Sequence, residues 1–285
     1  MRVVVIGPGG QLGTDICKTF PAEDLVGLTH ARVEVADRAS VMSAIAELRP
    51  ALVVNTSAFH NVDLCETELD RAFAVNTTGA AHLADACREH GAALMHISTD
   101  YVFRGDASTP YDEGDCTGPR TVYGLSKAAG EQLIRNRLLQ HYIVRTSGLY
   151  GVAGASGKGG NFVERMLQLA RDGKDIKVVD DQVLSPTFTA DLAQKLLEIA
   201  GTERYGTYHV TSSESCSWYE FARTIFEKTH TRVNLEPTTT ATFASPAVRP
   251  AYSVLANNAL AAAGIERARP WRDALTDYLG RKQYL

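Results

Sequence analysis

A glycine-rich turn after a short apolar run at the amino end constrains this chain most. Residues 3–6 read Val-Val-Val-Ile, and Gly7, Gly10 and Gly13 follow in a GxxGxxG pattern at the start of an amphipathic segment. Glycine permits a tight turn and lets backbone N–H groups approach a phosphate, while the amino end of a helix favours negative charge. The pattern predicts a strand–turn–helix unit that binds a dinucleotide.

Short apolar runs and helical patterns alternate along the first half of the chain. The apolar runs lie at residues 2–6, 24–28, 51–55, 93–97 and 142–145, with a weaker one at 33–35. The helical patterns lie at residues 11–20, 40–48, 70–90 and 122–139. Nearly continuous Val, Ile and Leu runs are typical of parallel strands covered on both faces. We therefore expect an α/β fold with a Rossmann-type, doubly wound parallel sheet.

The alternation loosens after residue 145, where a second glycine-rich segment, 148–160, begins. Helical patterns follow at 162–171, 191–200 and 218–228, and strand patterns at 176–179 and 207–210. We expect a smaller α+β substrate domain interleaved with the sheet domain. The predicted division gives residues 1–149 plus about 178–205 to an NAD(P)-binding Rossmann domain, and about 150–177 plus 206–285 to the substrate domain.

Composition excludes several classes of protein. The 285 residues carry 29 Lys and Arg against 33 Asp and Glu, a formal net charge of -4, so no basic face for nucleic acid is expected. No apolar run is long enough for a membrane helix or a signal segment. Five widely spaced cysteines without a CxxC pair, and histidines without an HExxH pattern, favour reduced thiols, no metal site and a cytoplasmic location.

Tyr123 and Lys127 form a YxxxK pattern inside a predicted helix. At this spacing both side chains share one helix face, so the lysine ammonium can lower the pKa of the phenol and also hold a nicotinamide ribose. Thr99 follows the predicted strand 93–97, at the sheet edge where an open parallel sheet presents its ligands, and either orients a substrate carbonyl or caps a turn. A second YxxxK, Tyr278 to Lys282, has no cofactor motif around it and is expected at the surface.

The residues after the second predicted strand bear on the choice of cofactor. No carboxylate stands there to accept the ribose 2′-hydroxyl of NAD, whereas Arg32 could meet a 2′-phosphate. NADP(H) is therefore favoured and NAD(H) is possible, with Arg32 as a solvated loop arginine in the alternative interpretation. Asp37 is a candidate acceptor for the adenine amine.

Together these residues resemble the extended short-chain dehydrogenase/reductases and, among them, the dTDP-4-dehydrorhamnose reductases. The resemblance covers nearly the whole chain. It rests on GPGGQLG at 7–13, STDYVF at 98–103, YGLSKAAGE at 123–131, RTS at 145–147, GNF at 160–162, DQ at 181–182, SPT at 185–187, GTYHV at 206–210 and RP at 249–250. It implies NAD(P)H-dependent reduction of a nucleotide-sugar C4 ketone, with Tyr123 as proton donor, Lys127 tuning it and Thr99 orienting the carbonyl.

The resemblance also implies the remaining site residues. The cofactor set contains the glycines of the first turn together with Gln11, Leu12, Arg32, Asp37, Arg38, Ser57, Ala58, Asn76, Tyr123 and Lys127. The substrate set contains Val62, Asp100, Asn161, Gln182 and Arg249, of which Arg249 suits a pyrophosphate because guanidinium binds it at two points. Gln182 and Arg249 are ordinary loop residues in the alternative interpretation.

The chain also departs from the family pattern. Gly148 stands where the family usually has a tryptophan close to the sugar, so we expect a more open pocket and leave the sugar and its nucleotide undecided. Some members dimerise through magnesium; Asp15 matches one acidic residue, but Ala190 replaces another, so a homodimer is possible and no metal is predicted. The alternatives are another reductase or an epimerase of the superfamily, or a non-catalytic regulatory subunit resembling the methionine adenosyltransferase beta subunit.

Overall fold

The glycine-rich turn follows a central strand of a parallel sheet. The computed structural model describes residues 2–154, 160–243 and 245–285. Its six-stranded sheet has the order β10 (Gly206–His209), β5 (His141–Thr146), β4 (Ala93–Thr99), β3 (Leu52–Asn55), β1 (Val3–Ile6) and β2 (Leu25–Leu28). Each neighbouring pair is parallel. The predicted doubly wound α/β fold is confirmed.

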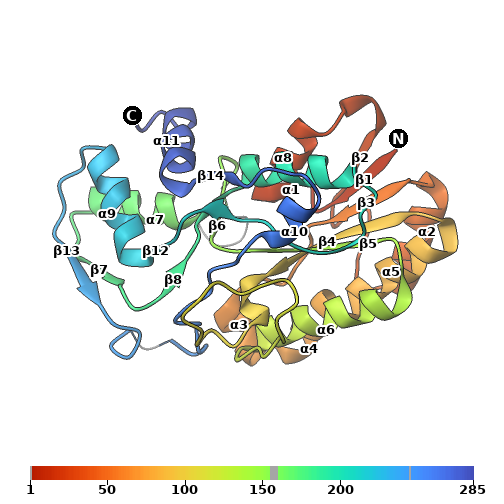
Figure 1. The fold of residues 1–285 in the computed structure, drawn as a ribbon, viewed down its shortest axis with the longest axis horizontal. Coiled ribbons are helices and arrows are strands. Elements are labelled where there is room, and N and C mark those ends of the chain that lie inside the picture. Colours follow the sequence, from red (N-terminus) through yellow and green to blue (C-terminus); the bar gives the residue numbers. More distant parts are fainter. Residues whose placement is uncertain (1, 155–159, 244) are drawn as a thin grey trace.

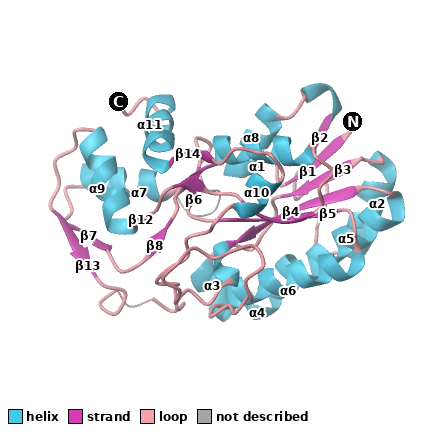
Figure 2. Ribbon diagram, in the orientation of Figure 1, coloured by secondary structure: helices cyan, strands magenta, loops and turns pink. Residues whose placement is uncertain are grey.

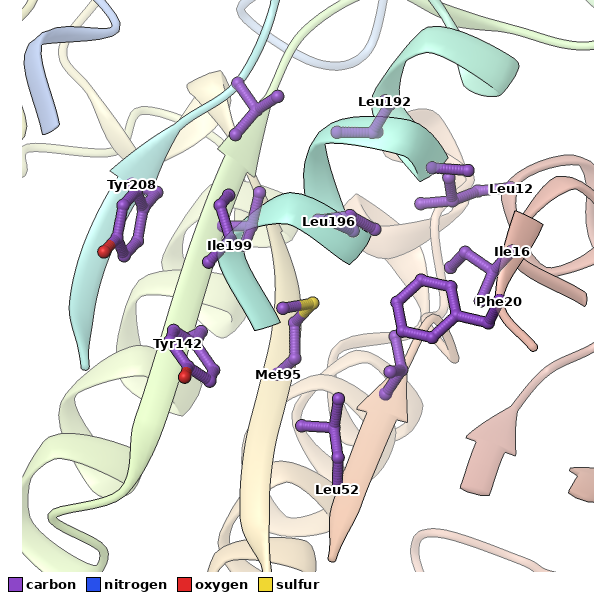
Figure 3. Close-up of a cluster of buried hydrophobic side chains, with 14 of the residues drawn as sticks. Leu12, Ile16, Phe20, Leu52, Met95, Tyr142, Leu192, Leu196, Ile199 and Tyr208 are labelled. Atoms are coloured by element: carbon purple, nitrogen blue, oxygen red, sulfur yellow. The ribbon is translucent and has the colours of Figure 1, made fainter. Parts of the chain in front are cut away.

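Helices cover both faces of this sheet (Figure 2). Val3 and Val5 of β1 face a core formed with α1 (Gln11–Thr19), α8 (Thr189–Ala200) and α10 (Asn258–Ala262), part of which is drawn in Figure 3. Val4 and Ile6 face the opposite core, beneath α2 (Arg38–Leu48), α5 (Gly79–His90) and α6 (Val122–Arg137). Alternate strand residues point to opposite faces, which explains why β1 is apolar at every position.

A smaller unit lies beside the large sheet, on the side where the strands of that sheet end (Figure 1). Its helices are α7 (Phe162–Arg171), α9 (Trp218–Lys228) and α11 (Trp271–Arg281), which pack around the buried Phe221, Trp271 and Tyr278. Its short strand pairs are β7 (Ile176–Val179) with β13 (Leu235–Thr238), β8 (Val183–Leu184) with β12 (Cys216–Ser217), β6 (Leu149–Tyr150) with β9 (Thr187–Phe188), and β11 (Ser212–Ser213) with β14 (Ala268–Pro270).

The pairing differs from the predicted domain boundaries at two places. β7 and β8 pair within the smaller unit, although residues from 178 onward were assigned to the sheet domain. β10 pairs with β5 in the large sheet, and α10 packs in the core of that sheet, although residues from 206 onward were assigned to the substrate domain. The chain passes between the two units more often than its hydrophobic pattern predicts. A strand at the edge of a sheet has the same hydrophobic pattern in either unit, so the pattern does not show which unit the strand joins.

Two local predictions were wrong, at residues 33–35 and at Tyr278, and the helix predicted at 70–90 is confirmed with a π-helical turn inside it. Residues 33–35 form a loop, not a strand, because Val33 and Val35 are buried under α2 and α5 without joining a ladder. The helix predicted at 70–90 is divided into α4 (Leu69–Phe73), a π-helical turn η2 (Ala74–Thr78) and α5, and α3 (Val62–Thr67) precedes it. Tyr278, expected at the surface, is fully buried at the centre of the smaller unit.

The short 3-10 turns η1 (Ala22–Asp24) and η3 (Asp100–Val102) complete the elements. Within the described ranges, no helix is both long and apolar enough to cross a bilayer. None of the five cysteines, all of them within the described residues, forms a disulfide bond. Part of the second glycine-rich segment, 155–159, lies outside the described residues.

Candidate active site

The glycine-rich turn forms a narrow cradle at the point where the strand order reverses. Gly7 adopts a φ of +83°, and a Cβ there would lie 2.7 Å from the Thr56 hydroxyl at the end of β3. A Cβ on Gly13 would lie 2.1 Å from the Gly7 carbonyl oxygen. Gly10 is the N-cap residue of α1, and no side chain caps that helix. The absence of side chains beside a free helix amino terminus fits the pyrophosphate of a dinucleotide.

Other residues of the predicted cofactor set have structural partners. The Gln11 side-chain amide donates to the Leu149 carbonyl (3.2 Å), and Leu12 is buried in the core under α1. Asn76, in the π-helical turn, accepts from the Phe59 N–H (2.9 Å) and donates to the Phe59 carbonyl and the Ser126 hydroxyl (both 3.0 Å). The side chains of Gln11, Leu12 and Asn76 thus contact other parts of the protein. A cofactor in the cradle would therefore contact the backbone of residues 11–12 and not their side chains.

The adenosine end of the predicted site lies between β2 and α2. Arg32 is exposed and lines a pocket of about 180 Å³ together with Ser40, Ser43 and Glu47. Arg38 is an exposed first residue of α2, and the Asp37 carboxylate caps this helix by accepting from the backbone N–H groups of residues 39 and 40. Asp37 thus has a structural task, while Arg32 and Arg38 are available to a ligand.

The proposed catalytic residues meet above the carboxyl end of β4. Thr99 is the last residue of β4, and Tyr123 and Lys127 lie one turn apart on α6. Thr121 caps α6 by accepting from the Gly124 N–H (3.0 Å), which fixes where the helix begins. The Thr99 side chain lies close enough to the Tyr123 hydroxyl to act on its pKa. Residues that are separate in the sequence therefore lie together in one site, where the Tyr123 phenol is next to the Thr99 hydroxyl.

The surroundings of Tyr123 keep its phenol protonated. Burial raises the pKa of Tyr123, the hydrogen bond with Thr99 opposes this, and the charge of Asp100 raises the pKa further. Tyr101 packs edge-on against the Tyr123 ring at 5.7 Å between centroids. A protonated phenol next to a hydroxyl can donate a proton to an oxygen placed between them.

Asp100 is a buried partner of the Thr99 hydroxyl. Its carboxylate accepts from the hydroxyls of Thr99 (2.9 Å) and Ser147 (2.8 Å), and its side chain is almost fully buried. Burial raises the pKa of Asp100. In this structure both carboxylate oxygens of Asp100 have partners inside the protein, and a contact of Asp100 with substrate stays a prediction.

Sequence reasoning missed a buried pair of polar residues behind Lys127. The Nζ atom of Lys127 lies 2.9 Å from His96 Nε2 and donates to the Ile97 carbonyl (2.7 Å). His96 Nδ1 lies 3.0 Å from the amide nitrogen of Asn55, whose oxygen accepts from the Ser57 N–H (3.0 Å). Asn55 and His96 could have been identified from the sequence, because they are polar residues within predicted strands that are expected to be buried.

The candidate substrate residues are only partly brought together. Val62 begins α3 and is half-buried, and Arg249 reaches Asp63 of the same helix, with 2.9 Å between Nη2 and Oδ2. Asn161 instead caps α7 and donates to the Gly151 carbonyl (3.0 Å) and the Tyr278 hydroxyl (3.1 Å). Gln182 donates to the Thr240 hydroxyl (3.0 Å). The structure thus gives Asn161 and Gln182 structural contacts and leaves Arg249 as the cation of the set.

The space beside Gly148 is filled. Gly148 has a φ of +55°, and a Cβ there would lie 2.7 Å from Leu184 Cδ1 and 3.2 Å from Pro186 Cα. Leu184 occupies the position toward which a side chain at residue 148 would project, and a more open sugar pocket stays a prediction. A left-handed φ also favours glycine here.

Comparisons with known proteins agree with this geometry. The family model described as RmlD substrate binding domain matches residues 1–284. A spore coat polysaccharide biosynthesis protein of Bacillus subtilis is 43% identical, with 98% of this chain and 96% of that protein covered. A dTDP-4-dehydrorhamnose reductase of Streptomyces griseus is also 43% identical, with coverage of 97% and 92%. The crystal structure of the dTDP-4-dehydrorhamnose reductase of Bacillus anthracis in complex with NADP superposes with a TM-score of 0.94 at 37% identity, covering 98% of this chain and 99% of that one.

The parallel sheet, the glycine cradle and the Thr–Tyr–Lys arrangement define an NAD(P)H-dependent oxidoreductase of the extended short-chain dehydrogenase/reductase class. Within that class, the chain belongs to the dTDP-4-dehydrorhamnose reductase family.

Proposed function

We propose that this protein reduces the C4 ketone of dTDP-4-dehydro-L-rhamnose to give dTDP-L-rhamnose, with NADPH preferred over NADH. The observation that carries the proposal is the buried Tyr123 phenol beside the Thr99 side chain, near a glycine cradle that fits a dinucleotide. Relatives named as dTDP-4-dehydrorhamnose reductases, one of them solved with NADP, support the substrate and the cofactor.

The glycine cradle of residues 7–13 would hold the cofactor pyrophosphate, and Arg32 would meet the 2′-phosphate. When bound, NADPH supplies a hydride to C4 of the sugar. The Thr99 hydroxyl turns from Asp100 to the ketone oxygen and orients it, Tyr123 donates its proton to that oxygen, and solvent returns a proton to the phenolate. The Lys127 ammonium stabilises the phenolate while it exists. One C=O bond is reduced to an alcohol and one cofactor is oxidised per turnover.

The nucleotide-sugar would lie between the sheet domain and the smaller unit. Val62 and Arg249 are the proposed contacts, with Arg249 binding the pyrophosphate in place of its present partner Asp63. Because the side chains of Asn161 and Gln182 are engaged within the protein, we propose them as residues that shape this pocket.

The test is turnover with a defined ketone. The purified protein is mixed with NADPH and dTDP-4-dehydro-L-rhamnose, and the absorbance of the reduced nicotinamide is followed while the sugar product is identified by NMR. Stoichiometric oxidation of NADPH with formation of dTDP-L-rhamnose is expected. Conversion without net oxidation would indicate an epimerase, and absence of turnover with either NADPH or NADH would favour the regulatory-subunit alternative.

We also propose a cytoplasmic location and a homodimeric state. Five cysteines without a disulfide bond suit a reducing compartment. Leu64, Leu69 and Leu125 are each more than two-fifths exposed on α3, α4 and α6, helices that contact one another, and would supply apolar area for a second copy. Light scattering coupled to size exclusion tests the dimer, which a monomeric mass would contradict.

A further inference from the structure

A row of buried polar side chains runs behind Lys127 and is not required by the proton donation from Tyr123. Asn55 of β3 and His96 of β4 are partners in the parallel register. Each lies two residues beyond a core residue, Val53 or Leu94, on the sheet face that α6 covers. Asn55, His96 and Lys127 are at most 2% exposed, so water does not satisfy their polar atoms. These polar atoms must therefore find their hydrogen-bond partners inside the protein.

The direction of these hydrogen bonds is set from one end. The Ser57 backbone N–H, which can only donate, lies 3.0 Å from the Asn55 side-chain oxygen. The Asn55 NH₂ group consequently points at His96 Nδ1, 3.0 Å away. An amide NH₂ also only donates, so Nδ1 is an acceptor, and a neutral imidazole then carries its proton on Nε2.

The Nε2–H of His96 faces the Nζ atom of Lys127 at 2.9 Å. An ammonium has three donors and no lone pair, so this contact would place two donors against each other. A neutral amine accepts from Nε2–H and still donates to the Ile97 carbonyl at 2.7 Å. We infer that Asn55 and His96 are positioning residues that favour the neutral amine of Lys127 over its ammonium and bring the loss of its proton toward neutral pH.

The charges around Lys127 agree with this arrangement. Burial lowers the pKa of Lys127 to about 8, against an opposing effect of the Glu131 carboxylate. Burial, and then the charge of Lys127, lower the pKa of His96, so the imidazole is neutral. On α6 itself, the ionisable groups nearest in sequence to Lys127 are Tyr123 and Glu131. The elements that pack against α6 carry His96 on β4, His141, Tyr142 and Arg145 on β5, Asp100 and Tyr101 on η3, Asp63, Cys65 and Glu66 on α3, Asp70 and Arg71 on α4, and His82, Asp85, Cys87, Arg88, Glu89 and His90 on α5.

The consequence for catalysis rests on the proposed function. The ammonium form of Lys127 stabilises the phenolate of Tyr123, so activity falls as pH rises through the titration of Lys127. Asn55 and His96 would thus set the alkaline limb of the pH profile. A lysine without these neighbours would keep its proton to higher pH.

The first test does not depend on activity. In the cofactor-free protein labelled with ¹⁵N-histidine, the tautomer of His96 is read by NMR above the pH at which Lys127 titrates, and the signal is assigned with His96→Gln. The Nε2–H tautomer is expected. The Nδ1–H tautomer or an imidazolium would overturn the inference, even if the proposed reduction were correct.

The second test reverses the hydrogen-bond direction with Asn55→Asp. A carboxylate accepts from both the Ser57 N–H and His96 Nδ1–H, which turns the Nε2 lone pair toward Lys127 and favours the ammonium. We expect the His96 tautomer to switch and the alkaline limb of kcat to move up by about one pH unit or more. An unchanged tautomer and limb would contradict the inference. If Asn55→Asp does not fold, His96→Gln, whose amide oxygen can accept from an ammonium, should move the limb in the same direction.

The matched control is His141→Gln. His141 begins β5 at the opposite end of the sheet and is also partly buried, and burial lowers its pKa. It should leave the limb in place. An equal shift in this control would show that the change at His96 is not specific to Lys127.

Discussion

Arg249 and Asp63 form a two-point ion pair that joins the carboxyl-terminal part of the chain to α3. Nη2 lies 2.9 Å from Oδ2 and Nη1 lies 3.1 Å from Oδ1. The hydrogen bond with Arg249 lowers the pKa of Asp63, so the pair is charged at neutral pH. A guanidinium held at two points is already oriented for another planar or phosphate anion. A substrate pyrophosphate would therefore compete with Asp63 for Arg249.

Replacing Arg249 with alanine should raise KM for the nucleotide-sugar by about tenfold or more, because a charge-assisted hydrogen bond contributes about 1.5–3 kcal/mol. The affinity for NADPH should not change. Asp63→Asn is the matched variant, since it weakens the ion pair but keeps the cation. If both variants raise KM equally, Arg249 acts only by joining the two segments and not by binding substrate.

Gly13→Ala should abolish tight binding of the cofactor. The added methyl group would lie 2.1 Å from the Gly7 carbonyl oxygen and 2.9 Å from Pro8 Cα, so the turn cannot keep its shape. Isothermal titration with NADPH measures the effect. Gly114→Ala, where an added Cβ meets no atom within 4 Å, is the control and should bind normally. Unchanged affinity in Gly13→Ala would place the cofactor elsewhere.

Much of this arrangement could be predicted from the sequence, and the reasons for the failures are physical. The Gly7 turn and the Tyr123–Lys127 spacing are local, so the chain order alone places them on a strand end and a helix face. The burial of Tyr278 against Asn161 depends on a contact between residues more than 100 positions apart, which no local pattern contains. The capping of α7 by Asn161 is local, because its partner is the Glu164 N–H three residues on. Likewise, the space beside Gly148 is filled by Leu184, a residue of another strand.

Glu131→Gln should destabilise the fold by about 3–5 kcal/mol, because it leaves Arg145 buried without its counter-charge. Arg145 Nη2 lies 2.7 Å from Glu131 Oε2, and both side chains are at most 2% exposed. Urea unfolding measures the loss. Glu236→Gln, in an exposed pair with Lys177, should change stability by no more than about 0.5 kcal/mol. Equal effects of the two substitutions would contradict the role of this buried pair.

The same carboxylate predicts a pH dependence of stability. Burial opposes the charge of Glu131, but the hydrogen bond and charge of Arg145 outweigh it, so the pKa of Glu131 is lowered in the folded protein. Its contribution is present above the unfolded pKa of about 4.3 and is lost as pH falls through the lower folded value. In Glu131→Gln, the free energy of unfolding should therefore fall less steeply with acid. A slope identical to that of the wild type would contradict this assignment.

Arg32→Ala should weaken NADPH about tenfold while leaving the affinity for NADH nearly unchanged, since only NADPH carries the 2′-phosphate that a guanidinium would bind. Fluorescence titration of the two reduced cofactors measures both affinities. Equal weakening of the NADPH and NADH affinities, or no weakening of either, would show that Arg32 is a solvated loop residue that does not bind the 2′-phosphate.

The central claim is that Tyr123 donates the proton to the ketone, and Tyr123→Phe tests it most directly. Phenylalanine keeps the ring that packs against Tyr101 and removes only the hydroxyl that contacts Thr99. In the NADPH assay with dTDP-4-dehydro-L-rhamnose, kcat should fall by about 10²–10⁴-fold while the affinity for NADPH stays within about threefold. A variant that turns over at the wild-type rate would show that the proton comes from another group.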